Sequence, residues 1–347
     1  MAQKLTRLVV AAAIAAVAVF AAGCGDDDNG SAADDGGGGG DLTAVSLVVP
    51  NPSVIAMYPF FVAQDQGYFE EEGLDVTINA VDGTGPSLTA LASGTTDLVQ
   101  APTLAVLPAA AEGQFSPVMF FRDFVGSPIA VAAPPDAGIS TPADMEGKRI
   151  GVSALSGIET LVTQNLARTA DLDPENDLEI VPVGDGGQAA VALEREEVDA
   201  FAGGIADIAI VQARGLEMEL VPPPAGRSPM THAVWTTKEY AEANPEVLEG
   251  FSRAAAKALE YVGEDVDGLV EIATELSPEQ TSEPEVTEAL AETSVALHQP
   301  ADGVPYGHID GEEFQGWFDV ANQDGALDGL DPKGLFTNEY NGTGEGR

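Results

Sequence analysis

The chain has 347 residues, with 57 Asp or Glu against 14 Lys or Arg, giving a formal charge of −43. So acidic a chain lacks the basic residues that neutralise phosphates, which excludes nucleic-acid binding. One Cys excludes a disulfide framework, and three His without metal-ligand spacing argue against a metal centre. We therefore expect neither a metal nor a cofactor. Its length is sufficient for two domains, and its 44% of apolar residues is sufficient to give each domain a core.

The N-terminus has the order of an export signal. Lys4 and Arg7 precede an apolar run, 8–22, that is too short to span a bilayer comfortably. The run ends in Ala-Ala-Gly before Cys24, which resembles a bacterial lipobox, where the cysteine thiol becomes acylated. An ordinary signal peptide followed by a chance cysteine is the alternative. We predict a lipoprotein signal peptide over 1–23 and a lipid-anchored protein on the outer face of the cell membrane or in the periplasm.

The segment behind Cys24 is acidic and rich in glycine. Residues 25–41 contain no large apolar side chain and cannot contribute to a core. The Asp run lacks the ligand spacing of a calcium loop. The sequence therefore predicts a flexible tether over 24–41.

From Val45 onward, strand-like and helix-like segments alternate. The predicted strands are 45–49, 74–81 and 97–101, and the predicted helices are 58–66, 83–93 and a segment after Thr103, which we expect to act as its cap. Strands that alternate with helices of this length indicate parallel pairing in an α/β fold.

The same pattern then starts again. Its predicted strands are 148–153, 178–183 and 198–202, and its predicted helices are 158–168, 188–194 and 205–214. Prolines at 128 and 222–224 flank this second block, which suggests an insertion joined by two crossover segments. We predict lobe 1 from 42–127 and 225–347, and an inserted lobe 2 from 128–224.

The remainder of lobe 1 is predicted to be mostly helical. An apolar strand over 231–237 comes first. Asn244 is expected to cap a helix that has Pro245 at its first position. One face of that helix carries an apolar stripe, which indicates core packing. The stripe consists of Val247, Phe251, Ala254, Ala258, Leu259 and Val262.

Five sequence strings occur in order along both blocks. They are GYFEEEGLDV at 67–76, LASGTTDLVQA at 91–101, GISTPADMEGKRIGVS at 138–153, LEREEVDAFAGG at 193–204 and LFTNEY at 335–340. Together they resemble the solute-binding proteins of ABC importers for nitrate, sulfonates, taurine and thiamine-pyrimidine precursors, the SsuA/THI5-like group. This resemblance implies a type II periplasmic binding protein fold, with two α/β lobes joined by two crossover segments. It also implies a monomeric receptor that captures a small solute by hinge closure and delivers it to a permease and its ATPase.

Ligands of open α/β sheets bind beyond the carboxyl ends of the strands, where helix N-termini present N–H groups. The candidate ligand-binding residues at these turns are Asn51, Ser53, Thr84 and Thr103 in lobe 1, and Ser153, Ser156, Gly157, Thr160, Gln188 and Asp207 in lobe 2. Hydroxyls beside a glycine at 153–160 suit a sulfonate, nitrate or carboxylate. Ordinary helix capping is the alternative for the Ser and Thr residues.

Two charged residues point to different ligands. Arg122 is a candidate for a bidentate contact with an anion, although it could instead pair with Asp123 or brace the hinge. Asp207, if it faces the cleft, favours a donor-rich ligand such as an aminopyrimidine or amine. The ligand class therefore stays open between an anion and a pyrimidine-like compound.

Enzyme motifs are absent from the sequence. There is no Gly-x-Ser-x-Gly elbow and no phosphate loop. Related pyrimidine synthases consume their own His, but Met57 and Tyr58 stand after the first strand, where pyrimidine-binding relatives carry a His. His232 and His308 are expected to be surface or satisfied structural residues. We predict a non-enzymatic receptor; the alternatives are an extracytoplasmic enzyme on a similar fold and a ligand-sensing subunit of a signalling system.

Overall fold

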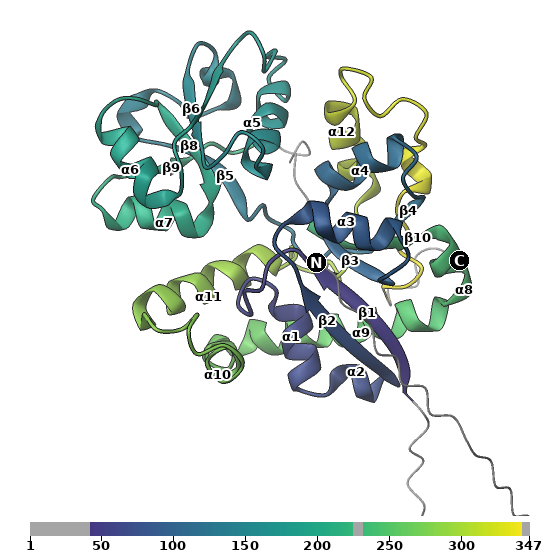
Figure 1. The fold of residues 1–347 in the computed structure, drawn as a ribbon. Helices are drawn as coiled ribbons and strands as arrows, with labels where there is room; N and C mark the ends of the chain where they lie inside the picture. The colour runs from purple at the N-terminus through teal and green to yellow at the C-terminus, as the bar shows by residue number, and fades with distance from the viewer. Residues whose placement is uncertain (1–41, 225–231, 342–347) are drawn as a thin grey trace, which may run out of the picture. The chain divides into compact units, whose positions relative to one another are not determined.

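The computed structural model describes residues 42–224 and 232–341, which form two α/β lobes, each built on a five-stranded mixed sheet (Figure 1). The predicted signal peptide, the lipidation site Cys24 and the tether lie outside the described residues. None of the described helices is long and apolar enough to cross a membrane.

The first sheet has the strand order β2-β1-β3-β10-β4. Its strands are β1 (Thr43–Val49), β2 (Leu74–Ala80), β3 (Leu98–Pro102), β4 (Pro117–Phe121) and β10 (His232–Thr237). Strand β1 pairs in parallel with both β2 and β3, as the alternating pattern predicts. Strand β10 runs antiparallel between β3 and β4.

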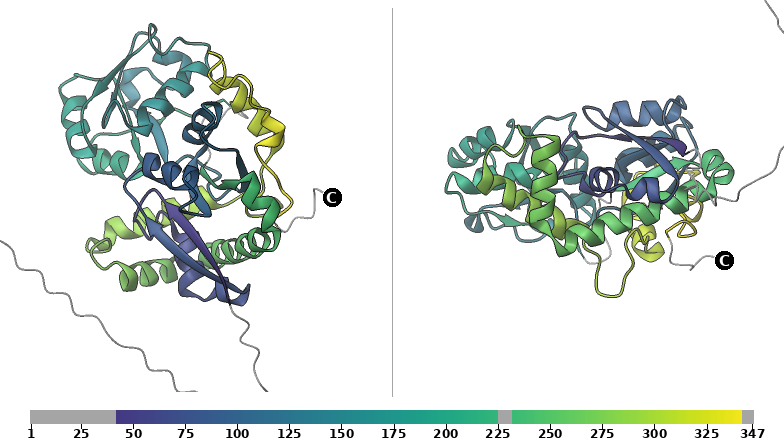
Figure 2. Two further views of the ribbon diagram at one scale, coloured as in Figure 1. Left: turned by 45° about the vertical axis from the view of Figure 1, so that its right-hand side comes forward. Right: turned by 90° about the horizontal axis from the view of Figure 1, so that it is seen from below.

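Helices cover both faces of this sheet (Figures 1 and 2). One core contains side chains of α1 (Tyr58–Asp65), α2 (Tyr68–Glu71), α9 (Pro245–Glu264), α10 (Val266–Leu276) and α11 (Pro284–His298). The core on the other face contains side chains of α3 (Thr84–Ala92), α4 (Thr103–Ala111) and α12 (Gly311–Ala321). Since the chain changes face between β1 and β3, the carboxyl ends of these two strands form a topological switch point, where ligands of such sheets bind.

The second sheet has the order β7-β6-β8-β5-β9. Its strands are β5 (Ile129–Ala133), β6 (Arg149–Val152), β7 (Glu179–Pro182), β8 (Ala200–Gly204) and β9 (Glu219–Leu220). The helices α5 (Ile158–Arg168), α6 (Gly186–Glu194) and α7 (Ile205–Ala213) follow three of them. Helix α5 packs in one core, and α6 and α7 pack in the other. The switch point of this sheet lies between β6 and β8.

The strands that alternate with helices in each block pair in parallel, as predicted, but one further strand of each sheet runs in the opposite direction. Strand β5 runs antiparallel to β8, as β10 does to β3. Strand β5 follows β4 of lobe 1 without an intervening helix, and it enters its sheet in the opposite direction. The short strands β5 and β9 are absent from the predicted elements, because their few residues lie next to the prolines of the crossovers.

Two predicted helix caps are also wrong. Thr103 is the first residue of α4, and Pro102 occupies the cap position. Asn244 does precede α9, but its Nδ2 donates to the carbonyl of Tyr240. Pro245 stands at the start of α9 as predicted. The predicted apolar stripe of that helix is buried, which confirms its role in core packing.

The C-terminal part of the chain contains further short elements. They are α8 (Lys238–Ala243) and the 3-10 turn η3 (Pro332–Gly334). In lobe 2, two further 3-10 turns, η1 (Pro135–Ala137) and η2 (Pro142–Met145), precede β6. Trp235 and Trp317 are both buried in the core beside α3, α4 and α12. They therefore serve packing.

Side chains of the two lobes meet along α5. Leu104, in the first turn of α4, forms a small apolar cluster with Val162 of α5. Near the other end of α5, Arg168 forms an ion pair with Asp324, 3.2 Å between Nη2 and Oδ2. The amino ends of α4 and α5, each of which carries predicted site residues, are thus brought together.

Candidate functional site

The turn before α5 leaves the start of this helix without a side-chain cap. Gly157 occupies the cap position, so the predicted hydroxyls do not cap α5. Ser156 is exposed and Ser153 is half-buried. The Thr160 hydroxyl donates to the carbonyl of Ala154 at 3.3 Å. The amino end of α5 is therefore a polar turn without a side-chain cap, and Glu159 places a carboxylate in its first turn.

Helices α6 and α7 are tied together at their starts by Asp207. Its Oδ1 accepts a hydrogen bond of 3.0 Å from the backbone N–H of Gly186. A Cβ atom at Gly186 would lie 2.5 Å from the carbonyl oxygen of Asp207, so only glycine fits this contact. Gln188, two residues further along α6, is exposed. Contact of Gln188 or Asp207 with a ligand stays a prediction.

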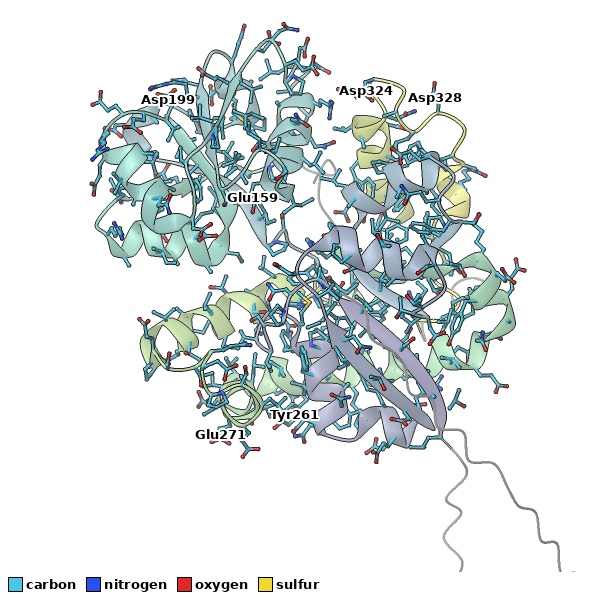
Figure 3. The ribbon with its side chains drawn as sticks, in the orientation of Figure 1. Glu159, Asp199, Tyr261, Glu271, Asp324 and Asp328 are labelled. Carbon is cyan, nitrogen blue, oxygen red and sulfur yellow. The ribbon has the colours of Figure 1, made fainter. Side chains whose placement is uncertain are left out.

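Negative charge gathers at these three helix starts of lobe 2. Glu159 is half-buried in the first turn of α5, where Figure 3 labels it. Burial raises the pKa of Glu159, and the carboxylates of Asp207 and Asp185 raise it further. Because Asp207 and Asp185 disfavour a negative charge on Glu159, a positive or donor-rich group beside Glu159 would be favoured.

The predicted lobe 1 residues mostly shape turns. The Asn51 Oδ1 accepts from the N–H of Ser53 at 2.8 Å, and the Ser53 hydroxyl accepts from the N–H of Ala56 at 3.2 Å. Thr84 is half-buried at the first position of α3, and Thr103 is fully buried at the start of α4. These residues lie at the carboxyl ends of their strands, as predicted, and their contact with a ligand stays a prediction.

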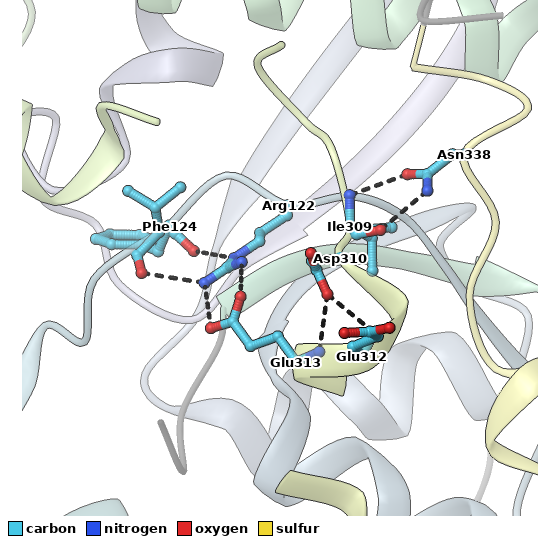
Figure 4. A network of polar contacts seen from close by, with 8 residues as sticks. Arg122, Phe124, Ile309, Asp310, Glu312, Glu313 and Asn338 are labelled. Atoms are coloured by element: carbon cyan, nitrogen blue, oxygen red, sulfur yellow. Dashed lines mark hydrogen bonds and ion pairs between the residues drawn. The ribbon is translucent and has the colours of Figure 1, made fainter. Parts of the chain in front are cut away.

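Arg122 braces the exit of β4 (Figure 4). Its Nη1 and Nη2 donate to the two carboxylate oxygens of Glu313 at 2.7 and 3.2 Å. Its Nε and Nη2 also donate to the carbonyls of Phe124 and Val125, both at 3.0 Å. The expected alternative of a pair with Asp123 is wrong, because the guanidinium fork is directed to Glu313. The contacts favour the brace over an anion receptor.

Asp123, the next residue, is buried and only partly paired. It is 1% exposed, and its Oδ2 accepts from Gln100 Nε2 at 2.9 Å. Its Oδ1 and the Oε1 of Gln100 have no hydrogen-bond partner among the described residues. Burial raises the pKa of Asp123 to about 7, although hydrogen bonds from Gln100 and the backbone and the charge of Arg122 lower it.

Three further buried polar side chains surround the same place. The ring of Phe124 lies 3.9 Å from the ring of His298 and 5.3 Å from that of His232, and Tyr58 lies 4.6 Å from His298 (centroid distances). The Tyr58 hydroxyl, His232 Nδ1 and His298 Nε2 also lack hydrogen-bond partners in the described part of the chain. Burial lowers the pKa of His232 to about 3 and that of His298 to about 4, so both rings are neutral at pH 7.

We call Tyr58, Gln100, Asp123, His232 and His298 the polar cluster. Its members come from the start of α1, from β3, from the crossover after β4, from the start of β10 and from the end of α11. The sequence prediction missed this cluster and treated His232 as a surface or satisfied residue; the structure buries it with an unpartnered nitrogen. A polar Gln inside the apolar run of β3 was the one available signal.

A cavity of about 310 Å³ borders the cluster at His298. It is also lined by Arg122, Val125, Tyr306, His308 and Glu313. The half-buried His308 has an Nδ1 without a partner among residues 42–224 and 232–341. In those same ranges, no three His, Cys, Asp or Glu side chains converge to hold a metal ion.

Comparisons with known proteins agree with this architecture. The family described as "NMT1/THI5 like" matches residues 55–267, which is more than half of the chain. YtlA of Bacillus subtilis (strain 168) is 25% identical over 124 residues. That match covers 35% of this chain and only 37% of the length of YtlA.

Two solved structures share the fold. The periplasmic aliphatic sulphonate binding protein SsuA of Escherichia coli has a TM-score of 0.66 at 14% identity, over 86% of this chain and 99% of that one. The periplasmic nitrate-binding protein NrtA of Synechocystis PCC 6803 has a TM-score of 0.59 at 11% identity, over 86% and 87%. The fold is therefore that of the periplasmic binding proteins, with two α/β lobes, and the chain belongs to the NMT1/THI5-like family.

Proposed function

We propose that this protein is the extracytoplasmic solute-binding component of an ABC importer. The observation that supports this most directly is the pair of topological switch points, one in each lobe, with polar turns and buried polar side chains at the carboxyl ends of the strands. The two related structures are, by their names, binding proteins for a sulphonate and for nitrate. A solute held between the lobes would engage both switch points.

The proposed binding cycle uses the two crossover segments as hinges. One crossover contains Asp123 and Phe124, and the other precedes β10. Contact between Leu104 of α4 and Val162 of α5 gives the lobes a surface on which to close. A solute drives closure only if it binds the closed state more tightly than the open one. The closed form would then be presented to a permease and its ATPase.

We further propose that residues 1–23 direct export, that Cys24 carries a lipid and that residues 24–41 form a tether. We also propose lobe limits of 42–127 with 225–347, and 128–224. Mass spectrometry of the membrane-bound protein tests the lipid. Export of a Cys24→Ser variant without membrane attachment would support the anchor, whereas retention on the membrane would contradict it.

The main experiment is thermal unfolding of the purified protein, unfolded and refolded to remove trapped solute. The additive is a low-molecular-mass extract of the growth medium, followed by its fractions. A bound solute at 100 times its dissociation constant should stabilise the protein by about 2.7 kcal/mol. We expect one fraction to raise the melting temperature and the active compound to be recovered unchanged by mass spectrometry.

An extracytoplasmic enzyme on the same fold makes a different prediction. It would convert the stabilising compound to a product of different mass during incubation. Recovery of such a product would overturn the receptor proposal, as would the absence of any stabilising fraction.

A further inference from the structure

We propose that the solute of this protein is a basic nitrogenous compound of the amidine, guanidine or amino-heterocycle class, and that its N–H groups donate hydrogen bonds to the polar cluster. This inference rests on the proposed function, since it assigns the chemistry of that same site. It follows from which atoms of the cluster are free to bond, from the charge around them and from the position of the cluster.

Three free atoms of the cluster are acceptors. Gln100 uses its Nε2 to donate to Asp123, so its Oε1 is left as an acceptor. The Oδ1 of Asp123 is a second acceptor when its carboxyl is ionised, the form that a neighbouring positive charge favours. His298 Nδ1 lies 2.7 Å from the carbonyl of Ser294 and must donate to it. The Nε2 of this neutral ring is consequently a bare acceptor.

The other two members can adapt to a donor. A tyrosine hydroxyl and a neutral imidazole nitrogen can each accept a hydrogen bond, and Tyr58 and His232 have these atoms unpartnered. Buried polar groups in native proteins are almost always bonded. Five such atoms gathered at one switch point therefore indicate a bound group that supplies several donors.

Arg122 does not serve this purpose. The guanidinium of Arg122 is the basic group whose charge acts on Asp123, and it already bonds Glu313 and the carbonyls of Phe124 and Val125. A sulfonate, nitrate or carboxylate has only acceptors to offer. It would set oxygen lone pairs against those of Asp123 and Gln100, so we exclude an anion from this position.

Lobe 2 adds negative charge of its own. Glu159, Asp185 and Asp207 stand at the starts of α5, α6 and α7, and the charges of Asp185 and Asp207 act on Glu159. Helix α5 contacts α4 through Leu104 and Val162. A basic solute between the lobes would meet acceptors from lobe 1 and carboxylates from lobe 2.

The position of Asp123 explains how a solute reaches a buried group. Asp123 and Phe124 lie between β4 and β5, on the crossover whose backbone must rotate when the lobes part. Next to them, the cavity of about 310 Å³ that His298 lines supplies open space. Opening of the hinge exposes the cluster, and closing buries the bound N–H groups.

The test is a set of small probes with one ring and different head groups, added to the stripped, refolded protein. Benzamidinium, benzoate and benzenesulfonate form the matched series, with 4-aminopyridinium, agmatine, taurine and nitrate as further probes. We expect the nitrogenous probes to raise the melting temperature and the anions to leave it unchanged.

Variants assign the effect to the cluster. Asp123→Asn keeps the shape but removes the charge-assisted bond, and should weaken benzamidinium binding about 10- to 100-fold in calorimetry. Asp75→Asn, at an exposed position of β2, is the matched control and should bind like the wild type. Glu159→Gln should weaken binding less, since Glu159 is half-buried.

Three outcomes would overturn this inference. They are stabilisation by an anionic probe, no response to any nitrogenous probe in a protein that does respond to the extract, and unchanged benzamidinium binding in Asp123→Asn, which would mean that the cluster holds only water. In each case the importer proposal survives. If the growth-medium extract also fails to stabilise the protein, both this inference and the importer proposal are overturned.

Discussion

The two lobes are alike at the amino ends of their strands and different at the carboxyl ends. In lobe 1, Asp97 precedes β3 and accepts bonds from the N–H and hydroxyl of Ser46 on β1, at 2.8 and 2.6 Å. In lobe 2, Asp199 precedes β8 and accepts at 2.8 Å from both the N–H and the Nη2 of Arg149 on β6. In both lobes, therefore, an Asp directly before one strand accepts hydrogen bonds from the neighbouring strand.

At the carboxyl ends the resemblance stops. Lobe 1 carries the buried polar cluster there, whereas lobe 2 has glycine-rich turns with half-buried or exposed carboxylates. Features shared by the lobes hold the sheets together, and features that differ mark where each lobe meets the solute. Four predictions test this division.

The largest effect is expected at Asp123, as a function of pH. Its pKa is about 7 in the folded protein and near 3.9 when unfolded. Between these values only the folded state holds the proton, so this group lowers the free energy of unfolding as pH rises from about 4 to 7. Asp123→Asn should therefore match the wild type near pH 4 and exceed it by on the order of 3 kcal/mol at pH 8.

Denaturant unfolding across this pH range provides the measurement. Arg122, Tyr58, His232 and His298 also face or neighbour Asp123. The lowered pKa values of the two His make stability rise over about pH 3 to 6.5, but they do so in both proteins and cancel in the difference. A constant difference at all pH values would contradict the buried, titrating carboxyl.

Next in size is the glycine that lets α6 pack on α7. Gly186→Ala would place a Cβ 2.5 Å from a backbone oxygen of Asp207 and should cost about 2–3 kcal/mol in chemical denaturation. Gly85→Ala in α3 of lobe 1 is the control, because nothing lies within 4 Å of its Cβ position. Gly85→Ala should be neutral or slightly stabilising. Equal losses in both variants would refute the packing argument.

Removal of the strand-linking Asp should lower stability by a similar amount in the two lobes. Asp97→Ala and Asp199→Ala each remove an acceptor from a backbone N–H and a side chain, and should each cost about 1–2 kcal/mol. Their urea midpoints provide the comparison. A loss confined to one lobe would show that the likeness is geometric only.

The smallest effect is expected where the lobes touch. Arg168→Gln removes the ion pair with the mostly exposed Asp324 and should change stability by less than about 1 kcal/mol. Arg195→Gln, whose pair with Glu197 lies within lobe 2, is the control. Solute affinity should change only in Arg168→Gln if this contact belongs to the closed state.

The regular parts of the fold were predictable, because hydrophobic period and turn residues are local signals. The helices over 158–168 and 205–213 lie where the pattern placed them. Strand direction was not predictable for β5 and β10, since it depends on pairing with strands that are distant in the sequence. The local sequence around β10 does not indicate the direction of this strand in the sheet.

The site divides in the same way. Polar turns after strands were found, because each is a short string such as 153–160. The polar cluster draws single residues from segments as distant as Tyr58 and His298, and only Gln100, inside the apolar run of β3, differs from its neighbours. Arg122 beside Asp123 suggested a local ion pair, whereas in the fold Arg122 pairs with Glu313, 191 residues away. Only tertiary packing shows which polar groups are left unpaired.

The insertion of β10 between β3 and β4 has a consequence for the order in which the protein acquires its structure. Every strand of the lobe 2 sheet lies within residues 129–220, but the lobe 1 sheet has an empty slot until residues 232–237 occupy it. A contiguous unit pays less loop-closure entropy than one assembled from distant segments. We therefore expect pulsed hydrogen exchange to show β6 and β8 protected before β10; early protection of β10 would reverse this order. The domain that interrupts the chain would then be the first to become native, and the domain that begins it would be the last.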